Sequence, residues 1–284
     1  MMRSFPPRVW TLLCFLVVSA ASALAQEPQI VYEPQVGQPG KDVVWVPTDD
    51  GLVGKMLDLA QVTPQDYVID LGSGDGRTVI AAARRGARAH GIEFNPDMVD
   101  LSIRNAAEAG VSGRATFVKA DLFESDFSGA TVITMFLLPD INLKLRPRLL
   151  DLKAGTRVVS NSFTMEEWQP DGTASMEGEC LTWCTAYLWI IPAKVEGAWS
   201  LEDGRLELNQ QFQIVKGAVL SGGKRVPVVG RIDGEKIDFH TGETEYVGVV
   251  RGDTMSGTIK TAAGERPFHA KREAGGQSAA GIWR

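Results

Sequence analysis

The stretch VIDLGSGDGR, residues 68–77, constrains the fold of this chain more than any other feature. It begins within an apolar run that predicts a buried strand at 67–71, and a helical pattern over 78–85 follows it. Glycines at a strand-to-helix turn let the backbone take unusual dihedrals and pass close beneath a ligand. The stretch therefore predicts a nucleotide-type binding loop inside an α/β domain.

Strand and helix patterns alternate along residues 43–193. The strands are continuous apolar runs, which is typical of a parallel sheet covered on both faces. Thr48 is predicted to cap the first helix. We expect a doubly wound, mostly parallel, Rossmann-like α/β sheet with further strands at 89–93, 115–119, 131–138, 156–160 and 185–191, and further helices at 48–60, 96–109 and 143–152.

Residues 194–284 follow a different pattern. Short runs of alternating apolar and polar residues are separated by turn signals such as Asp203-Gly204 and Gly222-Gly223. This spacing predicts a small antiparallel all-β domain, either an up-and-down barrel or a half-barrel. Residues 26–42 are interrupted by prolines, and they are expected to form an extended lead-in to the α/β domain.

The first 25 residues have the composition of an export signal. Arg3 and Arg8 form a basic start, residues 9–18 are mostly apolar, and Ala23-Leu24-Ala25 fits a cleavage site before Gln26. The alternative is an uncleaved anchor, although the apolar stretch is short for a span of about 20 residues. We therefore expect an exported protein in the periplasm or cell envelope, or one anchored to the inner membrane by this segment.

The chain is acidic. Its net charge is −6, and removal of residues 1–25 takes away two arginines and no acid, which brings the charge to −8. Such a chain has no general attraction to phosphate backbones, so we expect no nucleic-acid partner.

The cysteines and histidines leave the redox state open and predict no metal site. Cys180 and Cys184 would lie about 13 Å apart in a continuous strand, too far for a disulfide. A turn between them would allow the bond, but free, partly buried thiols are the favoured interpretation. Two thiols alone do not make a zinc site, and the three histidines, His90, His240 and His269, are scattered along the chain.

Acidic residues lie at the ends of the predicted strands, and proteins of this fold bind their ligands at that edge of the sheet. The dinucleotide fingerprint G-x-G-x-x-G is broken because Arg77 stands at the third glycine position. Asp70 lies two residues before the first glycine. A missing glycine and an added acid suit a ligand that has a positive charge and no pyrophosphate. S-adenosylmethionine has both properties.

Two more acids complete the predicted cofactor site. Glu93 ends the second strand and can accept both ribose hydroxyls, and Asp121 follows the third strand and can accept from the adenine amino group. The carboxyl ends of parallel strands meet at one edge of the sheet. We therefore predict an S-adenosylmethionine site formed by Asp70, Gly72, Ser73, Gly74, Gly76, Glu93, Asp121 and Leu122. The alternative is the same fold with a vacant site.

Several ordered motifs between residues 43 and 192 resemble class I methyltransferases. They are Trp45-Val46-Pro47-Thr48, the glycine loop, Gly91–Pro96, Asp121-Leu122-Phe123, Leu138-Pro139, and Trp168 with Asp171. Within that class the chain is most similar to the mitochondrial lysine methyltransferases that act on the ATP synthase c-subunit and the adenine nucleotide translocase. The resemblance implies methyl transfer to a lysine side chain of a protein, which could be membrane-associated.

The predicted acceptor channel follows from the chemistry of lysine. Its amine is neutral in only about one molecule in a thousand at pH 7, and desolvation beside a sulfonium lowers its pKa. An apolar channel can therefore replace a strong base. Asp140 and Asn142 could steer the incoming ammonium, although Asp140 could equally cap a helix. The channel candidates, each of which could instead be plain core, are Phe136, Leu137, Leu138, Pro139, Phe163 and Trp168.

Two functions are therefore compared. One is an S-adenosylmethionine-dependent protein-lysine methyltransferase, which the three strand-end acids favour. The other is a non-enzymatic exported binding protein whose β domain holds a ligand or an envelope partner. The export signal favours the second, because the methyl donor is made in the cytoplasm.

Overall fold

The structure is a computed structural model that describes Met1, residues 32–178 and residues 180–274. Apart from Met1, the predicted signal or anchor segment lies outside the described residues. Within the described part of the chain, no helix is both long enough and apolar enough to cross a membrane.

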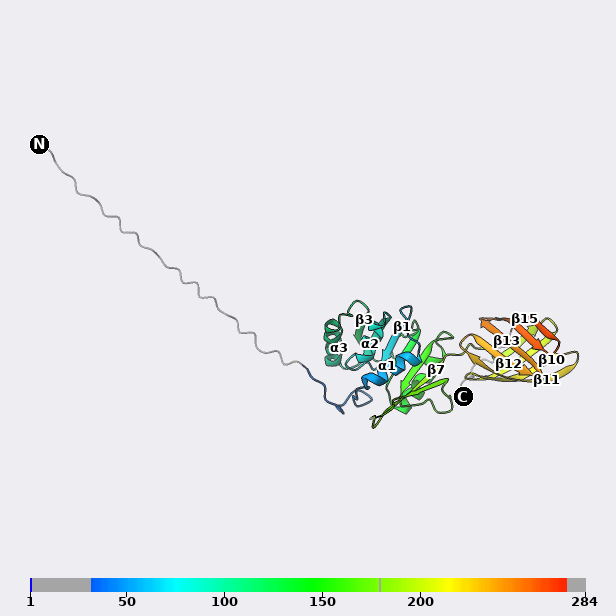
Figure 1. Cartoon of the computed structure of the whole chain (residues 1–284), viewed down its shortest axis with the longest axis horizontal. Coiled ribbons are helices and arrows are strands. Elements are labelled where there is room, and N and C mark those ends of the chain that lie inside the picture. Colours follow the sequence, from blue (N-terminus) through cyan, green and yellow to red (C-terminus); the bar gives the residue numbers. More distant parts are fainter. Residues whose placement is uncertain (2–31, 179, 275–284) are drawn as a thin grey trace. The chain divides into compact units, whose positions relative to one another are not determined.

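A seven-stranded sheet forms the centre of the α/β region, in the order β3-β2-β1-β4-β5-β7-β6 (Figure 1). Strands β1 to β5 are parallel, whereas β7 runs antiparallel to β5 and β6 antiparallel to β7. This topology confirms the predicted mostly parallel, Rossmann-like sheet. The strands are β1 (Tyr67–Leu71), β2 (Arg88–Glu93), β3 (Ala115–Lys119), β4 (Val132–Met135), β5 (Arg157–Asn161), β6 (Gly172–Ser175) and β7 (Thr185–Ile190).

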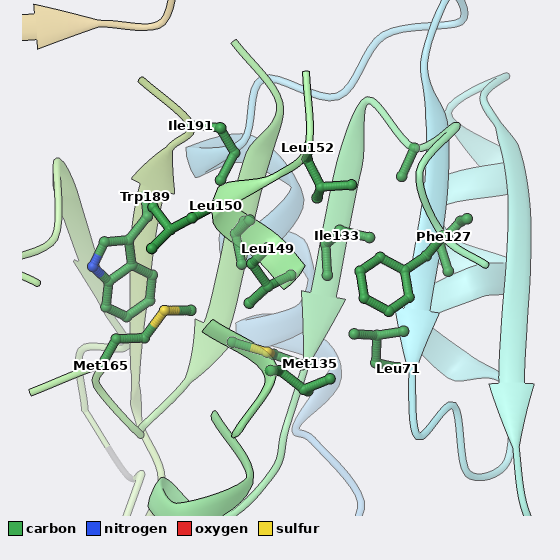
Figure 2. Packing of buried hydrophobic residues seen from close by; sticks show 14 of the residues in the cluster. Leu71, Phe127, Ile133, Met135, Leu149, Leu150, Leu152, Met165, Trp189 and Ile191 are labelled. Atoms are coloured by element: carbon green, nitrogen blue, oxygen red, sulfur yellow. The ribbon is translucent and has the colours of Figure 1, made fainter. Parts of the chain in front are cut away.

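Successive residues of the central strands point to opposite faces of the sheet, and both faces are buried. Val68 and Val132 belong to the core with α1 (Asp50–Leu59), α2 (Arg77–Arg84) and α3 (Pro96–Glu108). Ile69 and Ile133 belong to the other core, with α4 (Pro139–Leu150). Figure 2 shows Leu149 of α4 close to Ile133 in that second core. Burial on both faces explains the continuous apolar strands.

Element boundaries differ from the prediction at three places. Asp49, not Thr48, caps α1, because its carboxylate accepts hydrogen bonds from Gly51 N (2.7 Å) and Leu52 N (3.4 Å). Strand β4 ends at Met135, since Pro139 stands at the first turn of α4 and its fixed φ favours starting the helix there. Residues 172–175, where the sequence predicts no strand, form β6.

The C-terminal region is a closed eight-stranded barrel in which sequence neighbours pair antiparallel and β15 returns to β8. This confirms the up-and-down barrel and excludes the half-barrel. Its interior is packed with buried side chains, including Trp199, Phe239 and Phe268. The strands are β8 (Gly197–Leu201), β9 (Gly204–Gln211), β10 (Ile214–Ser221), β11 (Lys224–Asp233), β12 (Lys236–Thr241), β13 (Thr244–Arg251), β14 (Thr254–Thr261) and β15 (Gly264–Arg272).

The turn between β9 and β10 joins the core that contains α4. Phe212 is 3% exposed and stacks on Trp168 with ring centroids 5.5 Å apart. The neighbouring Gln213 donates a hydrogen bond of 2.7 Å to the carbonyl of Gln169. The barrel is therefore not joined to the α/β region by the chain connection alone.

Candidate functional site

A cavity of about 500 Å³ lies at the carboxyl ends of strands β1, β2 and β4. Asp121, which follows the end of β3, also lines it. This is the edge of the sheet between β1 and β4, where the strand order reverses and ligands of such folds bind. The volume lies within the range of small-molecule pockets. Of the predicted cofactor residues, the cavity brings together Asp70, Gly72, Ser73, Gly74, Glu93, Asp121 and Leu122.

The glycine loop leaves no room for side chains beneath the cavity. Gly72 and Gly74 have φ values of 79° and 53°, a left-handed region that favours glycine. A Cβ on Gly74 would lie 2.7 Å from the indole nitrogen of Trp45. Gly76 lies outside the residues that line the cavity. It precedes α2, and a Cβ there would meet Phe117 at 2.8 Å, so a glycine is needed for close packing against β3.

Glu93 connects the end of β2 to the glycine loop. One carboxylate oxygen accepts a hydrogen bond of 2.9 Å from Gly74 N, and the other accepts one of 2.9 Å from Asn95 N. The side chain therefore orders the loop and also lines the cavity.

Asp70 is a buried carboxyl in the same cavity. It is 6% exposed and accepts a hydrogen bond of 2.6 Å from the hydroxyl of Thr134. Burial raises the pKa of Asp70, the Thr134 hydrogen bond lowers it, and the nearby charges of Glu93 and Asp75 raise it; together they bring the pKa to about 7. A ligand that brings positive charge would favour the ionised form.

Asp121 pairs with Lys41, a residue that the sequence analysis assigned to the extended lead-in. The ion pair raises the pKa of Lys41 and lowers that of Asp121. The Lys41 ammonium also lies 5.1 Å from the ring centroid of Phe94. Residues 37–45 fold back on themselves, because Gly37 N donates to the carbonyl of Trp45 at 2.8 Å. Residues 38–48 therefore form one wall of the cavity.

A row of aromatic rings forms another part of the cavity lining. Phe136 stacks with Phe163 at 6.1 Å between centroids and meets Trp183 edge-on at 5.9 Å. Leu137 and Leu138, two other predicted channel residues, line the same cavity. Sequence reasoning missed Trp183, because nothing local connects the loop after β6 with the end of β4.

Four residues predicted for the acceptor channel or for steering the acceptor lie outside the cavity lining. Trp168 is fully buried in the core beside Trp189, which agrees with the plain-core alternative. Pro139 begins α4 and lies outside the cavity lining. Asp140 is exposed in the first turn of α4. Asn142 is fully buried and its amide donates to the carbonyls of Phe163 (3.3 Å) and Thr164 (3.5 Å). Asn142 therefore holds the loop that carries Phe163, and it lies outside the residues that line the cavity.

Cys180 and Cys184 form a disulfide, which corrects the favoured interpretation of free thiols. The loop between β6 and β7 turns back on itself and brings the two Cα atoms to 5.8 Å. The geometric objection applied to a continuous strand, and these residues are not in one.

The expectation of no metal site stays a prediction. Oxygen and nitrogen atoms of Asp238, His240 and Glu245 on the barrel lie within 4.8 Å of one another and could hold an ion. Asp238 and His240 are exposed, and exposed acidic groups are common without a metal.

The cavity residues fit S-adenosylmethionine. Five carboxylates and two cationic side chains line the cavity, so its charge suits a cationic ligand. The buried hydroxyl of Ser73 has no hydrogen-bond partner among the described residues. A seven-stranded sheet with a glycine turn after β1 and acids after β2 and β3 around one cavity defines an S-adenosylmethionine-dependent methyltransferase.

Comparison with known proteins gives the particular family. Residues 70–172 match the model of the ANTKMT methyltransferase domain. A protein-lysine N-methyltransferase of Saccharolobus islandicus is 43% identical over 152 residues, which are 52% of this chain and 94% of that protein. The chain belongs to the same methyltransferase family as this protein-lysine N-methyltransferase, and S-adenosylmethionine is its cofactor.

Two further relatives illustrate the range of the family. The ATP synthase c-subunit lysine N-methyltransferase of Mus musculus is 40% identical over 117 residues, 41% of this chain and 47% of that protein. A structure described as an RNA methyltransferase from Salinibacter ruber, in complex with S-adenosyl-L-homocysteine, is 51% identical with a TM-score of 0.50. It is matched over 53% of this chain and 96% of its own. The chain thus spans nearly all of two relatives and about half of the mouse protein.

Proposed function

We propose that this methyltransferase transfers the methyl group of S-adenosylmethionine to the ε-amino group of a lysine in a protein. The observation that carries the proposal is the aromatic and apolar lining formed by Phe136, Leu137, Phe163 and Trp183 in the cavity that also holds the strand-end acids. The relatives named as lysine methyltransferases, from an archaeon and from mouse, support it.

Methyl transfer to lysine does not require a strong general base. S-adenosylmethionine, when bound, supplies an electrophilic methyl group on a sulfonium. The apolar lining would desolvate the acceptor ammonium and lower its pKa, so that a neutral amine with a free lone pair is present. The proton leaves to solvent before transfer. Asp70 and Glu93 contribute negative charge that favours a cationic cofactor.

RNA is the competing acceptor, because the Salinibacter ruber structure carries that description. The charge of this chain argues against it. The chain has 35 acidic and 29 basic residues, and acids also outnumber bases in the cavity lining. Proteins that bind RNA neutralise its phosphates with lysine and arginine.

The location and the kind of substrate form part of the proposal. Residues 1–25 support export to the periplasm or cell envelope, or anchoring there, and the Cys180–Cys184 disulfide agrees with an oxidising compartment. Relatives named for the ATP synthase c-subunit and for the adenine nucleotide translocase support a membrane-associated protein as the acceptor. The alternative of a non-enzymatic binding protein has no support from these comparisons.

A transfer experiment tests the proposal. The purified chain is incubated with S-adenosylmethionine labelled in the methyl group in three separate reactions. One contains envelope proteins, one contains soluble proteins and one contains RNA. We expect label on lysine, mapped by mass spectrometry, with the envelope fraction labelled most strongly. Label on RNA but never on lysine would contradict the substrate class. Gly74→Ala serves as the variant with weakened cofactor binding and should label more slowly, and Gly54→Ala, where a Cβ meets no atom within 4 Å, is its matched control.

A further inference from the structure

The loop between β6 and β7 places a tryptophan in the cavity from outside the parallel strands. Trp183 lines the cavity and is 44% exposed, whereas its loop neighbour Leu181 is 95% exposed. The base of the loop is held to β6 and β5, because Met176 N donates to the carbonyl of Cys184 at 2.9 Å and Ser162 N to that of Thr185 at 2.7 Å. Trp183 therefore stands directly beside an anchored point of the sheet.

The backbone of Trp183 is in an uncommon conformation. Its φ is 56°, in the left-handed region that bulky residues rarely adopt. The residue lies inside the short ring that the Cys180–Cys184 disulfide closes. Such outliers persist where the surroundings over-determine them, and they gather at functional sites. The disulfide is the covalent constraint that limits the loop to this conformation.

Trp183 completes a set of three rings. Phe163 and Trp183 each contact Phe136, at centroid distances of 6.1 and 5.9 Å. Aromatic faces attract ammonium groups, and indole is the strongest of them. Since five carboxylates line the same cavity, its field also favours a cation.

We propose that Trp183, positioned by the Cys180–Cys184 disulfide, forms with Phe136 and Phe163 an aromatic recognition site for the alkylammonium group of the acceptor. The inference rests on the proposed lysine methyltransferase function and adds a specificity-determining residue to it. Acceptor recognition then depends on the oxidised state of the loop. A dithiol reductant would supply two electrons and two protons, break the S–S bond, and leave two thiols on the chain and a cyclic disulfide of the reductant.

The test observes Trp183 directly and needs no turnover. The chain is labelled with 5-fluorotryptophan, and the ¹⁹F signal of Trp183 is identified by its loss in Trp183→Phe. Acetyl-trimethyllysine amide is titrated in the presence of S-adenosylhomocysteine. The comparison probe is the neutral isostere with carbon in place of the quaternary nitrogen. We expect the Trp183 signal to shift and the cationic probe to bind about fivefold more tightly than the isostere.

The disulfide is tested with the same titration. Treatment with a dithiol, or the double change Cys180→Ser with Cys184→Ser, should weaken binding of the cationic probe about fivefold. Affinity for S-adenosylmethionine, measured by calorimetry, should stay nearly constant, which also shows that the variant is folded. Leu181→Ala is the matched control in the same loop and should leave both affinities unchanged.

The outcomes separate this inference from the proposed function. The inference would be overturned by any of three results. They are a Trp183 ¹⁹F signal that does not shift on titration, equal affinity for the two probes, and unchanged binding of the cationic probe after reduction. If lysine is labelled in the transfer experiment while Trp183→Ala leaves the KM for the acceptor unchanged, the inference alone fails. If Trp183 responds to the cationic probe but label reaches only RNA, the proposed function alone fails.

Discussion

The hydroxyl of Thr134 on β4 donates a hydrogen bond of 2.6 Å to the carboxyl of Asp70 on β1, and both side chains are buried. This single bond does not offset the burial of the carboxyl, so the pKa of Asp70 stands at about 7 instead of its ordinary value of 3.8. The cavity therefore contains an acid that titrates in the physiological range. Two pH effects are expected from it.

The first effect is on stability without cofactor. The pKa of Asp70 is higher in the folded chain than in the unfolded chain, so the folded state binds the proton more tightly. The stabilisation is complete below about pH 4 and is lost as the pH rises through about 7. Relative to Asp70→Asn, which stays neutral, the wild type should lose free energy of unfolding between pH 5 and pH 8 in urea titrations. A constant difference would contradict the assignment.

The second effect is on cofactor binding. A cationic cofactor favours the ionised form of Asp70, so S-adenosylmethionine should bind more tightly as the pH rises from about 6 to about 8 and should release a proton. Calorimetry in buffers of different ionisation enthalpy measures that proton. Asp70→Asn should abolish the release, and Asp140→Asn, at an exposed position in α4, should keep it. Equal proton release in wild type and Asp70→Asn would assign the effect to another group.

Gly74→Ala should weaken S-adenosylmethionine binding by about tenfold or more, roughly 1.4 kcal/mol. The added Cβ would lie 2.7 Å from the Trp45 indole nitrogen, on a backbone with a φ of 53°. Either the glycine loop or residues 38–48 must move, and both line the cavity. Gly54→Ala is the control, because nothing lies within 4 Å of its Cβ. Calorimetry measures the affinity of each variant for S-adenosylmethionine. Equal affinities of the two variants would contradict the assignment of the cofactor site.

Lys41→Ala should tighten S-adenosylmethionine binding about threefold, the scale of an exposed ion pair. The Lys41 ammonium pairs with the carboxylate of Asp121, which the adenine amino group is predicted to use. Removing the ammonium removes that competition. Lys55→Ala, on the exposed side of α1, is the control for a change of net charge. Weaker binding in Lys41→Ala would mean that Lys41 helps to hold the cofactor.

Asn142→Leu should lower the free energy of unfolding by about 0.5–1.5 kcal/mol, because two part-buried carbonyls lose a hydrogen-bond donor. The affected carbonyls belong to Phe163 and Thr164, so the acceptor KM should rise more than the dissociation constant of S-adenosylmethionine. Urea titration and steady-state kinetics measure the two effects. A loss of kcat at normal stability would instead restore Asn142 as a residue that contacts the acceptor.

Local patterns predicted the sheet and the gathering of three acids at one edge of it. Buried parallel strands are continuous apolar runs, and an acid at the carboxyl end of such a strand must face the ligand edge whatever the rest of the chain does. For this reason the sequence alone placed Asp70, Glu93 and Asp121 together. The place of Gly76 could not be read from the sequence, because a glycine in the loop can serve either ligand approach or packing, and its close approach to Phe117 depends on the tertiary structure.

The other residues that line the cavity could be identified only from the tertiary structure. Lys41 and Trp45 reach the cavity because residues 38–48 fold back across it, and Trp183 reaches it because β7 runs antiparallel to β5 and carries its loop to the end of β4. The disulfide between Cys180 and Cys184 likewise depends on a turn that strand spacing does not encode. Periodicity reports the face and the neighbours of a residue within its own element. Contacts between elements depend on how strands pair and how loops close across the whole chain, and no local pattern contains that information.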